Sequence, residues 1–199
     1  RLMAVAGRIE IKVTEKYLIE RGILAKPYFV YHKIAYTPDE ARIRAELASK
    51  HLNFRVGMST PYQKAYQLGI VYNIGRNEAV VRDALMYRDH GLNCMTLVRI
   101  KRHGQILMEM MKESGLRVDF IYGESNQSTR QAKLNSLAAG KIDVLIGSTI
   151  LDVGVDVPSV GAVILAGGGK AEVEMRQRVG RGLRAKKNQA NVCFISDFI

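Results

Sequence analysis

A basic segment near the C-terminus, residues 177–184 (QRVGRGLR), carries the side chains best suited to phosphate chemistry. On a helix, residues three and four apart are neighbours, so Gln177, Arg181 and Arg184 would share one face. Arginine is planar, permanently charged and able to hold a phosphate through two hydrogen bonds. In phosphoryl transfer, an arginine at the γ-phosphate contributes ~10³ to 10⁵ in rate. A solvated basic helix face explains this spacing equally well.

A second segment, residues 147–158 (GSTILDVGVDVP), directly follows an apolar run at 142–146 that is typical of a strand. Thr149 offers a hydroxyl group to a phosphate, and Gly154 permits close approach of a ligand to the backbone. Asp156 could accept a hydrogen bond from a sugar hydroxyl or an arginine. An ordinary turn rich in Gly, Asp and Pro is the alternative interpretation.

The elements that must position these segments alternate along the C-terminal half of the chain. Apolar, strand-like runs are separated by amphipathic stretches, several of which end at a glycine suited to a helix C-cap. This pattern predicts an α/β fold with a mainly parallel sheet and helices on both faces. Ligands of such sheets bind at the carboxyl ends of the strands. The predicted strands are 93–98, 117–122, 142–146, 160–166 and 191–196, and the predicted helices are 77–89, 103–114, 128–139 and 172–185.

The N-terminal half shows less regular patterning. Residues 26–36 (KPYFVYHKIAY) favour one further strand, and Thr37 followed by Pro38 is a typical helix start. We expect residues 1–25 to be a connector and residues 26–199 to form one lobe. The role of residues 38–75 stays open between an insertion that contacts nucleic acid and simple packing.

The charge balance points to a polyanionic partner. The chain has a net charge of +11 and a pI near 9.8, which favours nucleic acid or an anionic membrane surface, although a basic protein without such a partner is also compatible. No apolar run approaches the ~20 residues of a membrane span, so we expect no membrane partner. Cys94 and Cys193 lie far apart within strand-like runs, which fits a reducing, cytoplasmic location rather than a disulfide framework.

The order and spacing of the two segments resemble motifs V and VI of superfamily 2 helicases. Residues 177–184 match the QxxGRxxR form of motif VI at every fixed position, and residues 147–158 resemble motif V of branch-migrating, DNA-remodelling members. The stretch from Cys94 to Met111 resembles the motif IV strand and helix, and Tyr122-Gly123 and Arg130 fall where the family has a glycine and an arginine. The resemblance covers about residues 77–199, and residues 17–27 resemble the connector out of the first motor lobe.

The resemblance implies a C-terminal, RecA-like lobe and a role for each matching residue. Arg181 and Arg184 match the arginine fingers, which would make them catalytic. Gln177, Asp156 and Gly154 would contact ATP. The remaining expected contacts are to nucleic acid, with DNA favoured by the form of motif V, and they involve Thr149, Arg99, Lys101 and Gly123.

The chain departs from the family in lacking the ATP-binding half of the motor. It has neither a GxxxxGKS or GxxxxGKT loop nor a DExH acid pair. The run Gly167-Gly168-Gly169-Lys170 is a decoy, since Ala171 replaces the serine or threonine that would bind Mg²⁺. We therefore expect ATP and Mg²⁺ to be bound with an N-terminal RecA-like lobe upstream of Arg1, and this chain alone to be inactive. The alternatives are a non-catalytic, basic nucleic-acid-binding module and an unrelated doubly wound domain that binds a nucleotide or anion.

Overall fold

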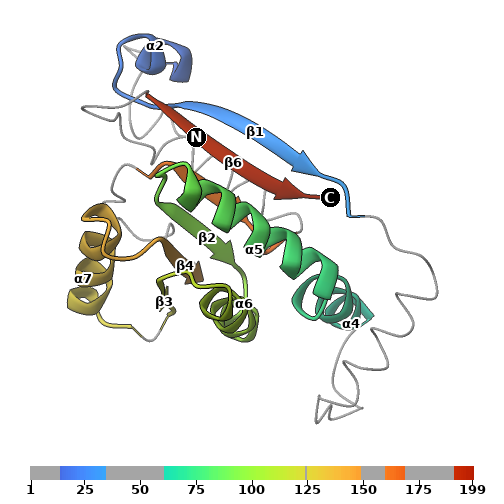
Figure 1. Cartoon of the computed structure of the whole chain (residues 1–199). Helices are drawn as coiled ribbons and strands as arrows, with labels where there is room; N and C mark the ends of the chain where they lie inside the picture. Colours follow the sequence, from blue (N-terminus) through green and yellow to red (C-terminus); the bar gives the residue numbers. More distant parts are fainter. Residues whose placement is uncertain (1–13, 35–60, 124, 149–159, 169–190) are drawn as a thin grey trace, which may run out of the picture.

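The computed structural model describes residues 14–34, 61–123, 125–148, 160–168 and 191–199. These residues form a six-stranded sheet in the order β1-β6-β5-β2-β4-β3, and every neighbouring pair is parallel. The strands are β1 (Lys26–His32), β2 (Cys94–Val98), β3 (Val118–Ile121), β4 (Val144–Ser148), β5 (Ala162–Leu165) and β6 (Val192–Phe198). The mainly parallel sheet predicted from the sequence is confirmed (Figure 1).

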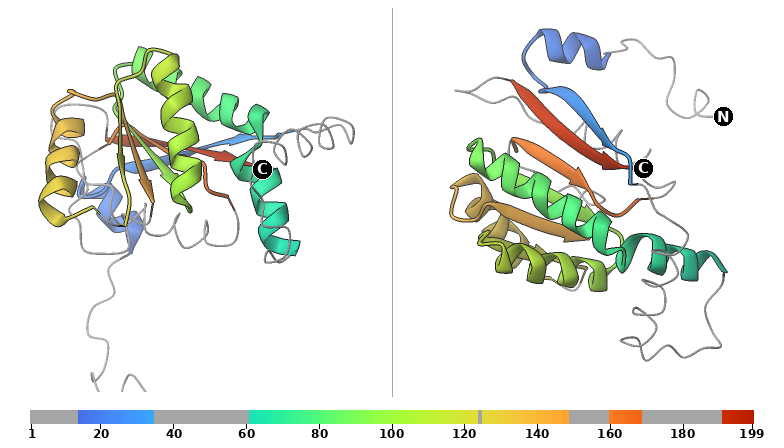
Figure 2. Two further views of the ribbon diagram at one scale, coloured as in Figure 1. Left: turned by 90° about the horizontal axis from the view of Figure 1, so that it is seen from below. Right: turned by 45° about the vertical axis from the view of Figure 1, so that its right-hand side comes forward.

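The helices are α2 (Glu15–Glu20), α4 (Pro61–Tyr66), the π-helix η1 (Gln67–Val71), α5 (Ile74–Asp89), α6 (Lys101–Glu113) and α7 (Gln127–Ala138). Helices α5 and α6 cover one face of the sheet, and α7 covers the opposite face (Figure 2). Residues of central strands alternate between the two resulting cores, so that Cys94 belongs to the first and Met95 to the second. The predicted cover on both faces is therefore confirmed.

Local sequence signals explain where several helices begin and end. The side chains of Asn73 and Asn126 cap α5 and α7 by accepting hydrogen bonds from backbone N–H groups of the first turn. Gly115 and Gly140 follow α6 and α7 with φ of 80° and 67°, the left-handed conformation that glycine adopts without strain. Both were predicted as helix C-cap glycines. The predicted helices at 77–89, 103–114 and 128–139 correspond to α5, α6 and α7, each with an earlier start.

Strand β1 lies at one edge of the sheet and pairs along its whole length with β6. Its His32 Nε2 lies 2.7 Å from Asp83 Oδ2 of α5, so a polar contact ties this edge to the helical layer. The predicted strand at 26–36 is shorter than expected, since β1 ends at His32. The predicted helix start at Thr37 and the predicted helix at 172–185 lie outside the described residues.

Residues 61–71 form helical structure where the sequence pattern left the role open. Helix α4 runs directly into η1, and Val71 at the end of η1 is fully buried. On the N-terminal side, residues 15–20 form α2, and Leu24 and Ala25, between α2 and β1, are buried. The boundary at residue 25 between connector and lobe stays a prediction.

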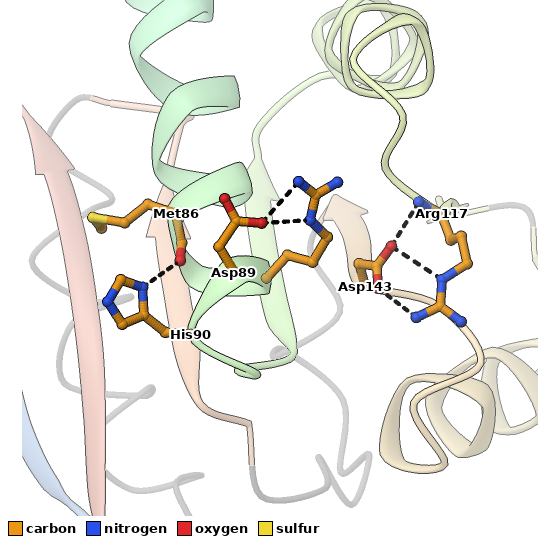
Figure 3. Close-up of polar contacts among 6 residues, drawn as sticks. Met86, Asp89, His90, Arg117 and Asp143 are labelled. Carbon is orange, nitrogen blue, oxygen red and sulfur yellow. Dashed lines mark hydrogen bonds and ion pairs between the residues drawn. The ribbon is translucent and has the colours of Figure 1, made fainter.

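Paired charges characterise the amino edge of the sheet, where the strands begin. Arg117, just before β3, holds Asp143, just before β4, through Nη2–Oδ1 and Nε–Oδ2 contacts of 2.5 and 3.1 Å. Nearby, the Arg88 Nη2 atom donates to Asp89 Oδ1 at 2.8 Å, and the His90 ring lies 2.7 Å from the Met86 carbonyl (Figure 3). The Arg117 hydrogen bonds hold the pKa of Asp143 below its usual range.

Candidate nucleic-acid interface

The carboxyl ends of the strands meet at the opposite edge, which we call the carboxyl edge. Because all strands are parallel, the residues after β2, β3, β4 and β5 emerge there together. The motif V segment, residues 147–158, begins with the last two residues of β4, Gly147 and Ser148. The predicted site residues Thr149, Gly154, Asp156, Gln177, Arg181 and Arg184 lie outside the described residues. Their predicted roles therefore stay predictions.

Arg99 follows β2 at the carboxyl edge and is exposed. Its Nη1 donates to the Tyr62 hydroxyl at 3.0 Å, and its guanidinium carbon lies 5.4 Å from the ring centroid of Tyr66. Within the part of the chain that the structure describes, no carboxylate lies within ion-pair distance of Arg99. Its guanidinium packs on the Tyr66 ring and uses Nη1 for the Tyr62 hydroxyl, which leaves other N–H donors available to a phosphate.

Lys101 opens α6 and lies close to Arg99 in sequence. Its Nζ atom is 4.0 Å from the ring centroid of Tyr122, the residue that follows β3. This is a short cation–π contact on the solvent side of the edge, since Lys101 itself is exposed. Two of the predicted nucleic-acid contacts, Arg99 and Lys101, thus each pack on a tyrosine ring, that of Tyr66 and that of Tyr122 respectively.

Gly123, the third described site residue, follows Tyr122 and precedes α7. Its carbonyl accepts a hydrogen bond of 2.8 Å from Arg130 Nη2, so the family-like arginine at this position holds the turn from within the lobe. A Cβ added at Gly123 would meet nothing within 4 Å. The role of Gly123 in binding nucleic acid stays a prediction.

A buried arginine that the sequence reasoning missed supports the carboxyl edge from below. Arg76 of α5 is only 5% exposed, and its Nη1 donates to the Phe198 carbonyl at 2.6 Å. Its Nε and Nη2 atoms each lie 3.4 Å from the Ala166 carbonyl. One guanidinium thus joins α5 to the ends of β5 and β6. The sequence around Arg76, in the first turn of α5, did not indicate this role.

His103 of α6 lies in the same buried layer. Its Nε2 atom is 2.9 Å from Oδ1 of Asn77, which suits a neutral ring that carries its proton on Nε2. Burial, and secondarily the charge of Arg76, lowers the pKa of His103 to about 4.

The glycine run after β5 packs closely at its first two positions. A Cβ on Gly167 would lie 3.1 Å from the Arg99 backbone nitrogen, and one on Gly168 would lie 2.6 Å from Ile70 Cδ1. The Tyr66 hydroxyl also donates to the Gly167 carbonyl at 2.6 Å. These two glycines therefore allow close packing against α4 and η1. Tyr62 and Tyr66, spaced four apart, were not identified from the sequence.

The described residues contain neither a candidate metal site nor a candidate membrane span. No group of three or more His, Cys, Asp or Glu side chains within them comes together in a way that could hold a metal ion. No helix among them is long and apolar enough to cross a membrane.

Comparison with known proteins identifies the family. A family model described as "Helicase conserved C-terminal domain" matches residues 77–186, more than half of the chain. The "Putative helicase 22" of Sulfolobus islandicus filamentous virus is 31% identical over 96 residues, which cover 48% of this chain and 17% of the viral protein. UvrABC system protein B of Thermosynechococcus vestitus is 36% identical over 95 residues, covering 45% and 14%. The chain thus spans only a small part of these curated relatives.

Solved structures show the same fold. The crystal structure of T4 UvsW aligns with a TM-score of 0.58 and 19% identity over 87% of this chain and 32% of UvsW. A DEAD box protein from Methanococcus jannaschii aligns with a TM-score of 0.50 and 26% identity, over 62% of this chain and 32% of that protein. With the parallel sheet and the motif order already described, the chain belongs to the helicase conserved C-terminal domain family, as a C-terminal, RecA-like lobe of the superfamily 2 type.

Proposed function

We propose that this chain is the second motor lobe of an ATP-dependent superfamily 2 helicase or translocase that acts on DNA. ATP would bind between an N-terminal RecA-like lobe and residues 26–199, with residues 1–25 as the connector. Closure on ATP and opening after hydrolysis would move the two lobes along the nucleic acid. The two cysteines, buried and free in the structure, support a reducing cytoplasm as its location.

Motif VI supplies the proposed catalytic groups. Arg181 and Arg184 stabilise the charge that develops on the γ-phosphate, which is the role of an arginine finger. Gln177 contacts the γ-phosphate side of the site, and Asp156 lies near the ribose and a finger arginine. Gly154 allows the backbone to approach the nucleotide. Mg²⁺ would be held by carboxylates of the first lobe, where it neutralises phosphate charge.

The observation that carries the nucleic-acid part of the proposal is the pair of cations at the carboxyl edge. Arg99 and Lys101 leave the motif IV strand on the edge from which motif V also departs after Ser148. Together with Thr149 and Gly123, they would contact the sugar–phosphate backbone. The preference for DNA rests on the GVDVP-like run of motif V, and the net charge of +11 supports a polyanionic track.

The deciding experiment measures ATP hydrolysis by the full-length protein carrying Arg181→Ala or Arg184→Ala, with and without duplex DNA. We expect turnover to fall by ~10³-fold or more while DNA binding persists, because the fingers act only on the transition state. Duplex RNA as a parallel activator tests the DNA assignment. The 199-residue chain alone is expected to show no turnover.

The second candidate is a non-catalytic nucleic-acid-binding module, which the basic carboxyl edge favours. In that case both arginine variants would leave ATP turnover of the full-length protein unchanged and would instead weaken DNA binding. A loss of ATP turnover therefore supports the motor lobe, whereas a loss of DNA binding alone supports the binding module.

A further inference from the structure

We propose that Tyr62 of α4, together with Tyr66 and Arg99, forms a stacking platform for an unpaired base of single-stranded nucleic acid. The platform adds a base contact to the backbone contacts of the carboxyl edge. This inference rests on the proposed function, because it requires that the lobe bind nucleic acid at the carboxyl edge.

The exposure and fixation of Tyr62 are the first observation. Its side chain is 62% exposed, yet its hydroxyl accepts a hydrogen bond from Arg99 Nη1 at 3.0 Å. The ring centroid lies 6.5 Å from that of Tyr66, with the planes inclined by 31°. Because the Tyr62 ring is exposed but already held through its hydroxyl, a base could stack on it with little further loss of side-chain entropy.

The anchoring of α4 is the second observation. The Tyr66 hydroxyl donates to the Gly167 carbonyl at 2.6 Å, which fixes the helix to the chain leaving β5. The adjoining η1 ends at Val71, which is fully buried. The amide of Asn73 also donates to the Gly69 carbonyl at 2.9 Å. The platform is therefore part of the lobe, and Figure 1 places α4 beyond the carboxyl end of β2.

The charge around the platform is the third observation, and it selects the ligand. Arg99 lies over Tyr66 and Lys101 lies over Tyr122, so each of these two cations is paired with an aromatic ring. Cations combined with aromatic rings suit single strands, because cations attract phosphates while rings stack on bases of any sequence. Paired bases in a duplex expose no free face to Tyr62, so the occupant must be unpaired.

Another exposed tyrosine provides a matched control within the same chain. Tyr17 of α2 is 47% exposed, and the Arg21 guanidinium carbon lies 5.3 Å from its ring centroid. It therefore shares the chemistry of the platform residue. However, α2 lies beside the start of β1, away from the carboxyl edge (Figure 1). A Tyr→Leu change at each position removes the same ring from two different places.

The test measures fluorescence anisotropy of labelled short oligothymidine, and of the same oligonucleotide built from abasic sites, with the 199-residue chain. Tyr62→Leu should weaken oligothymidine binding roughly tenfold, the factor expected for one lost stacking contact. Its effect on the abasic strand should be small. Tyr17→Leu should change neither. Tyr62→Phe, which keeps the ring and loses the hydroxyl, should retain most of the affinity.

The outcomes separate the platform from the underlying function. If the wild-type chain binds oligothymidine and abasic strands equally well, or if Tyr62→Leu matches Tyr17→Leu, the platform is refuted while phosphate binding stands. If the wild-type chain binds neither strand, the proposed function itself fails. If Tyr62→Leu in the full-length protein weakens only a fluorescent ATP analogue, the ring stacks on the adenine of ATP and the single-strand assignment is wrong.

Discussion

The two edges of the sheet handle positive charge in opposite ways. At the amino edge, Arg117 and Arg88 hold the carboxylates of Asp143 and Asp89. At the carboxyl edge, Arg99 and Lys101 rest on the rings of Tyr66 and Tyr122. The Arg117 guanidinium must lose its contact with Asp143 to bind a phosphate, whereas Arg99 can keep its packing on the Tyr66 ring. The difference indicates which edge is built to meet a polyanion.

The largest expected effect concerns the support beneath the carboxyl edge. Arg76→Leu should lower the free energy of unfolding by about 4 kcal/mol, because two buried carbonyls would lose their donors. Urea denaturation measures the change. The control is Arg117→Leu at the amino edge, where the side chain is exposed and a much smaller loss is expected. Equal losses would mean that the two edges do not differ in how their arginines act.

The pH dependence of stability should trace to the same buried layer. The pKa of His103 is lowered to about 4, so the unfolded chain binds its proton first as the pH falls. The neutral His103 ring therefore contributes roughly 3 kcal/mol to the free energy of unfolding above a pH of about 6.5. This contribution is lost progressively as the pH falls to about 4.

Replacing His103 by glutamine should therefore flatten the stability curve between these pH values. His90→Gln at the exposed end of α5 provides the same substitution outside the buried layer for comparison. Denaturant midpoints collected at several pH values provide the measurement. A slope that persists in the His103 variant would assign the acid sensitivity to other groups.

Nucleic-acid binding should distinguish the edges by its salt dependence. Arg99→Gln and Lys101→Gln should each weaken binding to duplex DNA several-fold and reduce the slope of log affinity against log salt by ~0.9, one phosphate each. Arg88→Gln and Arg117→Gln should leave that slope unchanged. Titrations at a series of salt concentrations measure it, and a slope that responds equally at both edges would contradict the comparison.

The smallest effect is expected from the amino-edge pair itself. Arg117 lowers the pKa of Asp143, so the pair stabilises the folded chain above the usual carboxyl pKa near ~4 and loses its contribution as the pH falls below it. Arg117→Gln should thus lower the Tm slightly at neutral pH. The Tm values of variant and wild type should converge in acid, whereas a constant difference would indicate that the carboxylate is not involved.

The sequence predicted most of the sheet because its strands are buried on both faces and read as continuous apolar runs. Residues 94–98, for example, are all buried, and the pattern placed that strand to within one residue. The helical segment at 61–71 was not predicted from the sequence. The capped start of α5 at Asn73 was also not recognised, although asparagine is a typical N-cap residue.

The candidate site was only partly predictable for a different reason. Arg99 and Lys101 were identified because they follow a strand, which is a local signal. The role of Arg76 depends on carbonyls 90 and 122 residues away in sequence, and the setting of Tyr62 depends on Arg99, 37 residues away. Contacts between residues so far apart in sequence form only when the sheet has formed, so local sequence patterns do not predict them.

The pairing of β1 with β6 has a mechanical consequence. The strands run parallel over seven register pairs, from Lys26 with Val192 to His32 with Phe198. A force that pulls Lys26 backward and Phe198 forward therefore shears all of these pairs together instead of opening them one by one. Tension applied to the chain at residue 26 would therefore be transmitted to β6, the strand that follows motif VI, without a change of register.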